Sequence, residues 1–596
     1  MMRIYTLLIS LFVFVNAFSS DQISVLEHPR LFWTSQNDSV VRHSLKSSVY
    51  AERLKNFSFQ CDTLINTPLL ERKKIGKRLL SVSREAERRI IMLSFMWRLT
   101  GDERYAERAK SELINVCSFS DWNPSHFLDV AEMCVAVSVG YDWLYNWLDE
   151  KSKKYISERL YRLGGHYVVN KRPSSMNRKD NWNQVCNSGA TIAAIALADD
   201  VINDYVSIID KSLMNVLRSQ MEYGVNGAYP EGHVYWEFGT GYNVLLYSAI
   251  ETAFKGTIKI DYNQKFMQSP FYIANMRGPI FKAFNYADNS EDFMYSPCLF
   301  WFALKLNKTC VAEYEYSMLN NKSINHRLMP LGLIWSAQID NSIDLQYNPP
   351  LYYVDNGFTP VFTIRSSWSD NNCWFIGAKG GKVNSPHGHM DVGSFVLDAG
   401  GVRWVSDLGP EPYNNIESKG IDLWNMKTQD CDRWNLFRYG FTSHNTLSFD
   451  DKPLLINKYC DISVDSVSNQ DIVVSVDLSP LYNQMVVKRS YHLVGNKYFE
   501  LCDEVKTTEK GTNMSWRIIT SAKVNIIDDY TVYLHKDGRT MMLHVDTDNK
   551  ISFNVAEAKP KNDFESTNEG YNILSFNSNL MANSKNTFNT IFKLIK

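Results

Sequence analysis

The pattern of apolar residues changes between residues 345 and 352, and this change constrains the fold more than any other feature of the chain. From about Leu26 to Leu345, apolar residues recur at helical spacing. From about Tyr352 onwards, short stretches rich in β-branched and aromatic residues are separated by turn residues. A run of helices followed by a run of strands predicts two domains, and 596 residues are too many for one core.

The first domain is predicted to consist of helical hairpins stacked in an arc or toroid. The helical stretch 84–99 stops at Gly101, and Asp102 is suited to begin the next helix. Residues 130–148 are apolar almost all round, as in a helix buried between others. We therefore expect an N-terminal α/α toroid over residues 21–347 and a C-terminal antiparallel β-sandwich over residues 348–596, with a subdivision near residue 500 left open.

Residues 1–20 are expected to be a cleaved signal peptide. A basic start at Arg3 precedes an apolar run from Ile4 to Phe18, which is short for a membrane span, and small residues follow. No later stretch reaches the roughly 18 consecutive apolar residues that a span needs. The mature chain is therefore expected to be exported to a periplasm or to the outside, without a membrane span.

Charge and cysteine content narrow the possible partners. The net charge is −2, so no global field attracts a nucleic acid, and an acidic substrate needs a local cluster of basic residues. The ten cysteines form no C-x-x-C pair, which argues against a zinc ribbon, and we expect most of them to be buried thiols. The oligomeric state stays open, with a homodimer among the options.

His387, His389 and Asp391 form the most unusual ionisable group in the chain. They are spaced at i, i+2 and i+4 before an alternating apolar stretch, so we interpret them as one face of a β-strand. Three ionisable side chains on one face of a core strand are rare, because burying them unpaired is costly. A solvated strand end is the ordinary alternative.

Three further stretches suit a cleft by their mixture of polar and aromatic residues. Residues 180–187 hold four carboxamides just before a helix, and capping explains only one of them. Residues 229–242 are interrupted by glycines and crowded with tyrosines and ionisable groups. Residues 433–439 pair two arginines with aromatic neighbours, and residues 443–447 follow with His444. A cap, an aromatic-rich connection and exposed arginines are their ordinary explanations.

Taken in order, these stretches resemble the heparinase II/III-like polysaccharide lyases, and most closely their heparinase II branch. The family includes alginate lyases and is related to the dermatan sulfate epimerases. The resemblance rests on residues 28–32, 181–183, 230–232 with the tyrosines that follow, 387–395, 402–409 and 444–447. It implies an α/α toroid followed by an antiparallel β-sandwich, in agreement with the residue patterns.

The resemblance also implies one zinc ion with a mainly structural role. The family's ligand positions match His389, Asp407 and His444, and Asp391 is a competing candidate. Two imidazoles, one carboxylate and a water suit tetrahedral Zn²⁺. The ordinary alternative is a set of polar strand ends.

The reaction implied by the resemblance is β-elimination, in which a uronic acid loses its C5 proton while its C4–O bond breaks. The family's base matches His387. Tyr235 is the predicted acid, and Tyr242 is the alternative because the motif does not fix the register. Asn183, with Asn181 close behind, is predicted to neutralise the uronate carboxylate.

Other residues are predicted to contact the substrate, which we expect to be an acidic polysaccharide or oligosaccharide. Glu231 is expected to support the tyrosine or orient a sugar hydroxyl, and Tyr413 to touch a sugar. Arg433 and Arg438 are candidates for bidentate binding of carboxylate or sulfate. Asn181 and Tyr242 complete this group of predicted contacts.

The expected function is an exported lyase for a uronic-acid-containing glycan, with a glycosaminoglycan such as heparan sulfate, chondroitin or hyaluronan favoured. An alginate lyase, a uronate C5-epimerase and a non-catalytic glycan-binding protein stay open. A zinc-dependent hydrolase with His387, His389 and Asp391 around a catalytic metal is a further alternative. Only a lyase yields an unsaturated product that absorbs in the ultraviolet.

Overall fold

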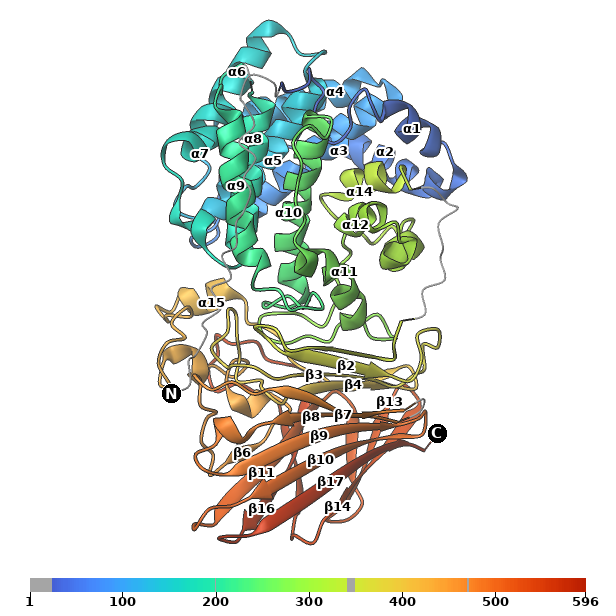
Figure 1. Ribbon diagram of the computed structural model, residues 1–596, viewed down its shortest axis with the longest axis vertical. Coiled ribbons are helices and arrows are strands. Elements are labelled where there is room, and N and C mark those ends of the chain that lie inside the picture. Colours follow the sequence, from blue (N-terminus) through green and yellow to red (C-terminus); the bar gives the residue numbers. More distant parts are fainter. Residues whose placement is uncertain (1–23, 199, 340–348, 469–470, 596) are drawn as a thin grey trace, which may run out of the picture.

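A computed structural model describes residues 24–198, 200–339, 349–468 and 471–595. Helices fill one half of the molecule and strands the other, which gives an α/α toroid followed by an antiparallel β-sandwich, as predicted (Figure 1). The last helix of the first half ends at Ser336 and the first strand begins at Tyr352. The predicted signal peptide and the predicted boundary at residues 347 and 348 lie outside the described residues.

The α-helices of the first half are joined by turns and short helical segments. They are α1 (Asp38–Ser44), α2 (Ala51–Ile65), α3 (Leu80–Thr100), α4 (Glu103–Ser118), α5 (Phe127–Leu144), α6 (Glu150–Leu160), α7 (His166–Asn170), α8 (Asn181–Ala196), α9 (Tyr205–Gln220), α10 (His233–Ala253), α11 (Gln264–Met276), α12 (Cys298–Leu306), α13 (Glu313–Ser317) and α14 (Met329–Ser336).

Local sequence signals account for several of these boundaries. Gly101 ends α3 in the left-handed conformation with φ 75°, which glycine adopts without strain. The Asp102 side chain accepts a hydrogen bond from the Arg104 N–H and so caps α4, as predicted. Every residue of α5 is buried, in agreement with its largely apolar sequence.

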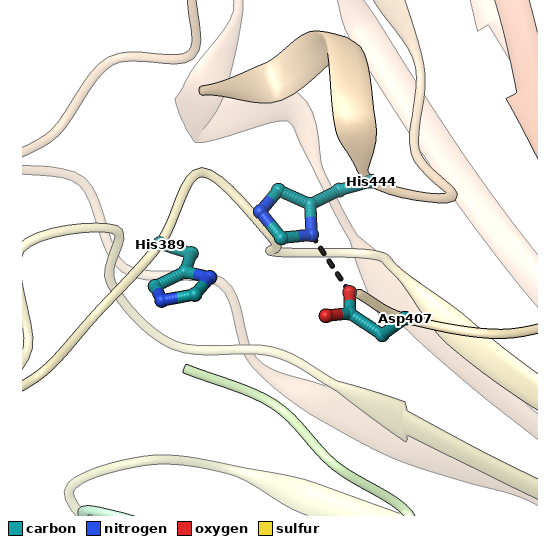
Figure 2. A group of neighbouring side chains, drawn as sticks. All are labelled: His389, Asp407 and His444. Atoms are coloured by element: carbon teal, nitrogen blue, oxygen red, sulfur yellow. Dashed lines mark hydrogen bonds and ion pairs between the residues drawn. The ribbon is translucent and has the colours of Figure 1, made fainter. Parts of the chain in front are cut away.

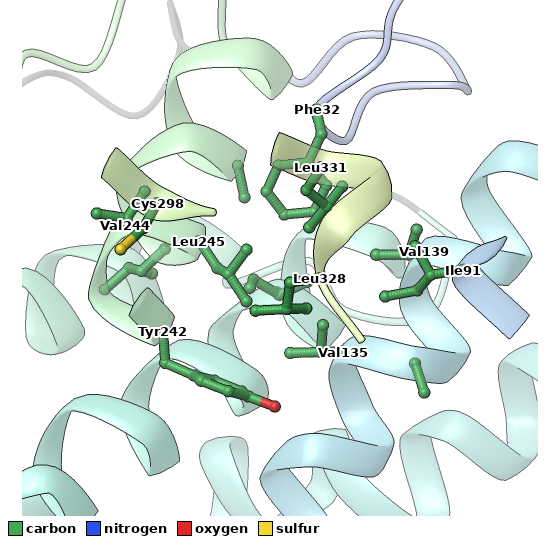
Figure 3. Packing of buried hydrophobic residues seen from close by; sticks show 14 of the residues in the cluster. Phe32, Ile91, Val135, Val139, Tyr242, Val244, Leu245, Cys298, Leu328 and Leu331 are labelled. Atoms are coloured by element: carbon green, nitrogen blue, oxygen red, sulfur yellow. The ribbon is translucent and has the colours of Figure 1, made fainter. Parts of the chain in front are cut away.

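Residues from several helices fill the centre of the toroid (Figure 3). Ile91 from α3, Val135 and Val139 from α5, and Leu245 from α10 are fully buried there. The toroid is therefore a packed core, and a polysaccharide can bind only at its surface or where it faces the β domain.

The described residues of the second half form three antiparallel sheets. The first runs β1 (Tyr352–Asp355), β2 (Val361–Arg365), β3 (Phe375–Lys379), β4 (Phe395–Ala399) and β5 (Val402–Val405). The second has the order β12 (Lys523–Ile526), β13 (Thr531–Lys536), β14 (Arg539–Asp546), β17 (Lys585–Leu594), β10 (Tyr498–Lys506), β9 (Val486–Val494), β8 (Asp471–Asp477) and β7 (Ile462–Val467). The third has the order β15 (Phe553–Glu557), β16 (Asn572–Leu580), β11 (Thr512–Thr520) and β6 (Ser448–Phe449).

The first sheet is the layer that meets the helices, since every residue of β2, β3, β4 and β5 is buried (Figure 1). Asp355 of β1 accepts hydrogen bonds from the backbone N–H groups of Asn226 and Ala228 in the helical domain. The short helix α15 (Tyr413–Glu417) also reaches the helical domain, because Arg78 donates two hydrogen bonds to Glu417 at 2.6 and 3.3 Å. The two domains therefore meet at both places.

All ten cysteines are free thiols, and eight of them are buried, in agreement with the sequence-based expectation. Among the described residues, no helix combines the length and the apolar character that crossing a bilayer demands.

Candidate functional site

Three aromatic side chains meet where the helical domain faces the β domain. The Tyr235 ring of α10 stacks on the His387 imidazole with 4.0 Å between ring centroids. The Tyr413 hydroxyl, from α15, lies 2.5 Å from the Tyr235 hydroxyl and 3.3 Å from His387 Nδ1. All three side chains are only partly buried, so a ligand can reach them. The structure thus brings the predicted acid and the predicted base together from different domains.

Backbone geometry at the start of α10 positions Tyr235. Gly232 precedes the helix with φ 90°, and a Cβ atom there would lie 2.2 Å from the Asn289 side chain. Asn289 Oδ1 accepts a hydrogen bond from the Val234 N–H and so satisfies the helix N-terminus. A loop between α11 and α12 therefore holds the first turn of α10 in place.

The predicted strand over His387, His389 and Asp391 is wrong. His387 lies in a turn, His389 and Asp391 lie in irregular chain, and β4 begins only at Phe395. His387 adopts a left-handed φ of 58°, which breaks the two-residue alternation of a strand and lets neighbouring side chains diverge. Gly388 permits the tight turn, because a Cβ atom there would lie 2.1 Å from the Val383 carbonyl oxygen.

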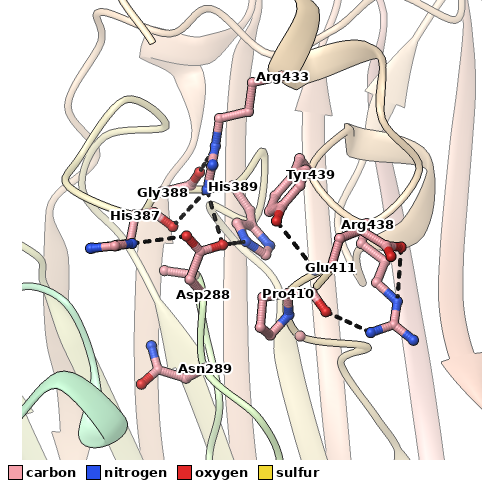
Figure 4. A network of polar contacts seen from close by, with 12 residues as sticks. Asp288, Asn289, His387, Gly388, His389, Pro410, Glu411, Arg433, Arg438 and Tyr439 are labelled. Carbon is pink, nitrogen blue, oxygen red and sulfur yellow. Dashed lines mark hydrogen bonds and ion pairs between the residues drawn. The ribbon is translucent and has the colours of Figure 1, made fainter. Parts of the chain in front are cut away.

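Asp288, which the sequence reasoning missed, is the centre of a polar network beneath this turn (Figure 4). Its Oδ2 accepts hydrogen bonds from His387 Nδ1 at 2.9 Å and from the Tyr413 hydroxyl at 2.8 Å. Its Oδ1 accepts hydrogen bonds from His389 Nε2 at 2.8 Å and from an Arg433 terminal nitrogen at 3.0 Å. Burial opposes its charge, but Arg433 and the two histidines hold the pKa of Asp288 well below its ordinary value.

Glu231 lies on the other side of the His387 ring, with 3.3 Å between its Oε2 and His387 Nε2. It accepts hydrogen bonds from the Asn181 backbone N–H at 2.9 Å, the Asn181 side-chain amide at 2.6 Å and the Tyr229 hydroxyl at 3.0 Å. Burial raises the pKa of Glu231 above its ordinary value. Asn181 and Glu231 therefore belong to the same cluster as the histidine.

Asn183 and Tyr242 are not part of this cluster. Asn183 lies two residues further along α8 than Asn181, on another face, and its amide donates to the carbonyls of Met176 and Asn215. Tyr242 is buried in the toroid core (Figure 3). Its hydroxyl donates a hydrogen bond to Glu87 at 2.7 Å. Both predicted roles conflict with these positions, because neither group faces the cleft.

Arg433 and Arg438 are also committed to contacts within the protein. Arg433 is fully buried and donates to Asp288 and to three backbone carbonyls, including those of His387 and Gly388. Arg438 donates to the Pro410 carbonyl and to the Asn568 side chain, and also pairs with Glu411. These contacts conflict with the predicted role of the two arginines in binding an acidic substrate. Both side chains instead stabilise the loops around the site.

Other basic and aromatic side chains border the site on the solvent side. Trp424 is 38% exposed and lies edge-on to His387 with 5.5 Å between ring centroids. Arg84 has a side chain that is 42% exposed, is anchored on the buried Glu132, and lies over Phe238, one helical turn beyond Tyr235. Arg178 is half exposed and lies over Trp182 at the start of α8. Sequence patterns did not single these residues out.

His389, Asp407 and His444 converge in the β domain, and one donor atom from each lies within 4.8 Å of the others (Figure 2). Asp407 follows β5, and His444 follows a short helical turn that ends at Ser443. His444 Nδ1 lies 2.7 Å from Asp407 Oδ2, and this carboxylate raises the pKa of His444 although burial opposes its charge. The exposed fractions of His389, Asp407 and His444 are 0%, 5% and 1%, so solvent in the cleft does not reach these side chains.

The donors of this group fit a zinc ion. His389 Nδ1 and His444 Nε2 are buried nitrogens without a hydrogen-bond partner among the described residues, and such atoms normally have one. His389 also donates its other ring nitrogen to Asp288, as metal-bound histidines usually donate to a carboxylate. Asp391, the competing candidate, instead pairs with the buried Lys379 and accepts the Ala287 N–H at 2.9 Å.

Comparison with known proteins agrees with this architecture. Residues 365–588 match the family model described as heparinase II/III-like, C-terminal. A heparin-sulfate lyase of Bacteroides stercoris is 26% identical over 195 residues, which are 32% of this chain and 27% of that protein. The matched region is thus a minor part of the relative's length.

Solved structures show the same fold over most of the chain. Heparan sulfate lyase HepC from Pedobacter heparinus, in a mutant form, superposes with a TM-score of 0.59 and 14% identity, covering 87% of this chain and 76% of that one. The chondroitin AC lyase of Streptomyces coelicolor, in complex with chondroitin sulphate, gives a TM-score of 0.51 and 8% identity, covering 94% and 83%. Residues 365–588 thus match the C-terminal domain model of the heparinase II/III-like proteins, and the fold of the chain is the one that these solved lyase structures share.

Proposed function

We propose that the chain is an exported polysaccharide lyase that cleaves a uronic-acid-containing glycosaminoglycan by β-elimination. The observation that carries the proposal is the stacked pair of Tyr235 and His387, which come from different domains and lie in hydrogen-bonding reach of Tyr413. The similar proteins are named as a heparin-sulfate lyase, a heparan sulfate lyase and a chondroitin AC lyase in complex with chondroitin sulphate, so heparan sulfate is the first substrate to test.

In this proposal His387 is the base. Its Nδ1–H is donated to Asp288, which leaves Nε2 to take the C5 proton. Asp288 on one side of the ring and Glu231 on the other then stabilise the imidazolium that forms.

Tyr235 is the acid that protonates the leaving oxygen. Burial, followed by the charge of Asp288, raises the pKa of Tyr235 well above its ordinary value, so the hydroxyl holds a proton to donate. Tyr413 lies next to it, and a hydrogen bond across the 2.5 Å contact between the two hydroxyls stabilises the phenolate that Tyr235 becomes until it regains a proton from solvent.

Asn181 takes the role of neutralising the uronate carboxylate. One hydrogen of its amide is donated to Glu231 at 2.6 Å, which orients the group and leaves the other hydrogen for the substrate. Arg84 and Arg178 are the proposed contacts to carboxylate or sulfate groups on neighbouring sugars, because both are half exposed beside the site.

A zinc ion on His389, Asp407 and His444 would hold the loops beneath the site together. A catalytic metal fits this arrangement poorly, because the group is buried and His387 turns to Asp288 instead. This geometry favours elimination over the metal-dependent hydrolysis that remained open from the sequence.

The test is a panel of heparan sulfate, heparin, chondroitin sulfate, hyaluronan and alginate incubated with the purified protein. A lyase gives an ultraviolet-absorbing unsaturated product. New reducing ends without ultraviolet absorbance indicate a hydrolase, and solvent deuterium at C5 of intact polymer indicates an epimerase. Either of these two results overturns the proposal.

A further inference from the structure

Asp288 contacts two histidines through opposite ring nitrogens. His387 faces it with Nδ1 and His389 faces it with Nε2, at 2.9 and 2.8 Å. A carboxylate only accepts hydrogen bonds, so each of these nitrogens must carry a hydrogen. The free lone pair of a neutral ring then lies on Nε2 of His387 and on Nδ1 of His389.

These are the two lone pairs that the site needs. His387 Nε2 is the atom that remains for the cleft, because Glu231 Oε2 lies 3.3 Å away but makes no hydrogen bond with it, whereas Nδ1 is hydrogen-bonded to Asp288. His389 Nδ1 is the buried nitrogen that faces the possible metal ligands. We infer that Asp288 is a positioning residue that fixes opposite tautomers of His387 and His389, and thereby makes one histidine a base and the other a metal ligand. This inference rests on the proposed function for its catalytic half.

The contact of Arg433 with Asp288 allows a test of the inference in which one carboxylate oxygen of Asp288 is replaced by an amide nitrogen. Arg433 donates to Asp288 Oδ1, the same oxygen that accepts from His389. In Asp288→Asn the remaining carbonyl oxygen must occupy this position, because an amide nitrogen there would face the donors of a permanently charged guanidinium. The new amide nitrogen therefore faces His387 Nδ1 and Tyr413.

An amide nitrogen only donates, so His387 must then accept at Nδ1 and carry its hydrogen on Nε2. The ring loses its function as a base, while His389 keeps its tautomer. We expect Asp288→Asn to lower turnover at least about a hundredfold and to change zinc affinity by less than about threefold. Asp288→Ala removes the acceptor from both rings and should weaken zinc binding about 10- to 100-fold as well.

The experiment compares these two variants with the wild type in zinc affinity by chelator competition, in the visible spectrum of the Co²⁺-loaded protein, and in turnover. Asp142→Asn is the matched control, since Asp142 is a buried carboxylate that pairs with His28 in the helical domain. It should lower the melting temperature and leave zinc affinity, the Co²⁺ spectrum and turnover per folded molecule unchanged.

A substrate-free readout separates this inference from the proposed function. Nitrogen-15 shifts of the His387 ring, assigned by their loss in His387→Gln, should show the hydrogen moving from Nδ1 to Nε2 in Asp288→Asn. If the wild type degrades no polymer, the proposed function fails, and the shifts and zinc affinities still decide the role of Asp288. An unmoved His387 hydrogen, or equal zinc loss in the asparagine and alanine variants, overturns the inference.

Discussion

Tyr235→Phe isolates the proposed proton donor, because it removes one hydroxyl and keeps the ring that stacks on His387. The lost contact is a hydrogen bond to Tyr413, whose hydroxyl still has Asp288 as an acceptor at 2.8 Å. No buried group is left without a partner, so the cost to the free energy of unfolding is about 1 kcal/mol, which lowers the melting temperature by a few degrees at most.

The effect on turnover is expected to be much larger. General acid catalysis contributes about 100- to 10,000-fold, so the loss of this group raises the activation barrier by roughly 2.7 kcal/mol or more. Turnover is measured at saturating substrate as the rate of ultraviolet-absorbing product, and the melting temperature is measured in parallel.

Tyr242→Phe is the matched control on the same helix. It removes a hydroxyl that donates to the buried Glu87, which keeps Arg327 as a partner at 2.6 Å. It should cost a similar amount of stability and leave turnover within about twofold. Strong loss of turnover in Tyr242→Phe with an active Tyr235→Phe would show that the assigned register is wrong, and two active variants would refute a tyrosine acid.

The remaining predictions concern the histidines, the asparagines and the cleft arginine. His387→Ala should abolish product formation while zinc content by elemental analysis stays at the wild-type level, whereas His389→Ala should lose zinc and melt at a lower temperature; equal zinc loss in both contradicts the division of roles. Asn181→Ala should reduce kcat at least about tenfold. Asn183→Ala should mainly lower the melting temperature, since its amide bonds two backbone carbonyls and the Ser219 hydroxyl inside the helical domain; the reverse result restores the original assignment. Arg84→Ala should raise KM several-fold with kcat nearly unchanged, and an unchanged KM removes it from the substrate site.

The sequence predicted the order of the two domains and many element boundaries, because those depend on local physics. Gly101 and Asp102 act as stop and cap within a few residues of their effect, and β2 and β5 occupy stretches of β-branched and aromatic residues. The strand expected at His387 failed because a left-handed turn there serves contacts with a distant loop.

The sequence indicated a site residue only where that residue belongs to a motif that resembles the family. His389, Asp407 and His444 are separated along the chain but converge, as the family resemblance implied. Asp288 lies 99 residues before His387 in a stretch without a periodic pattern, so no local signal indicated it.

The charged and amide residues were the hardest to assign, since sequence does not show which partners a side chain has. Arg433 has internal acceptors for its guanidinium, and Arg84 has an exposed fraction large enough to meet a ligand. The choice between Asn181 and Asn183 depends on which face of α8 packs against α9, a tertiary contact that the helix sequence does not encode by itself.

The base and the acid come from separate domains, and this division affects how the protein responds to heat. Contacts such as the one between Arg78 and Glu417 hold the domains together, and interfaces of this kind open more easily than domain cores. Slight loosening of the interface separates Tyr235 from His387 while both cores remain folded. We therefore expect heating to open this interface before either core melts, and a ligand that contacts both domains should raise the inactivation temperature with the logarithm of its concentration above its dissociation constant.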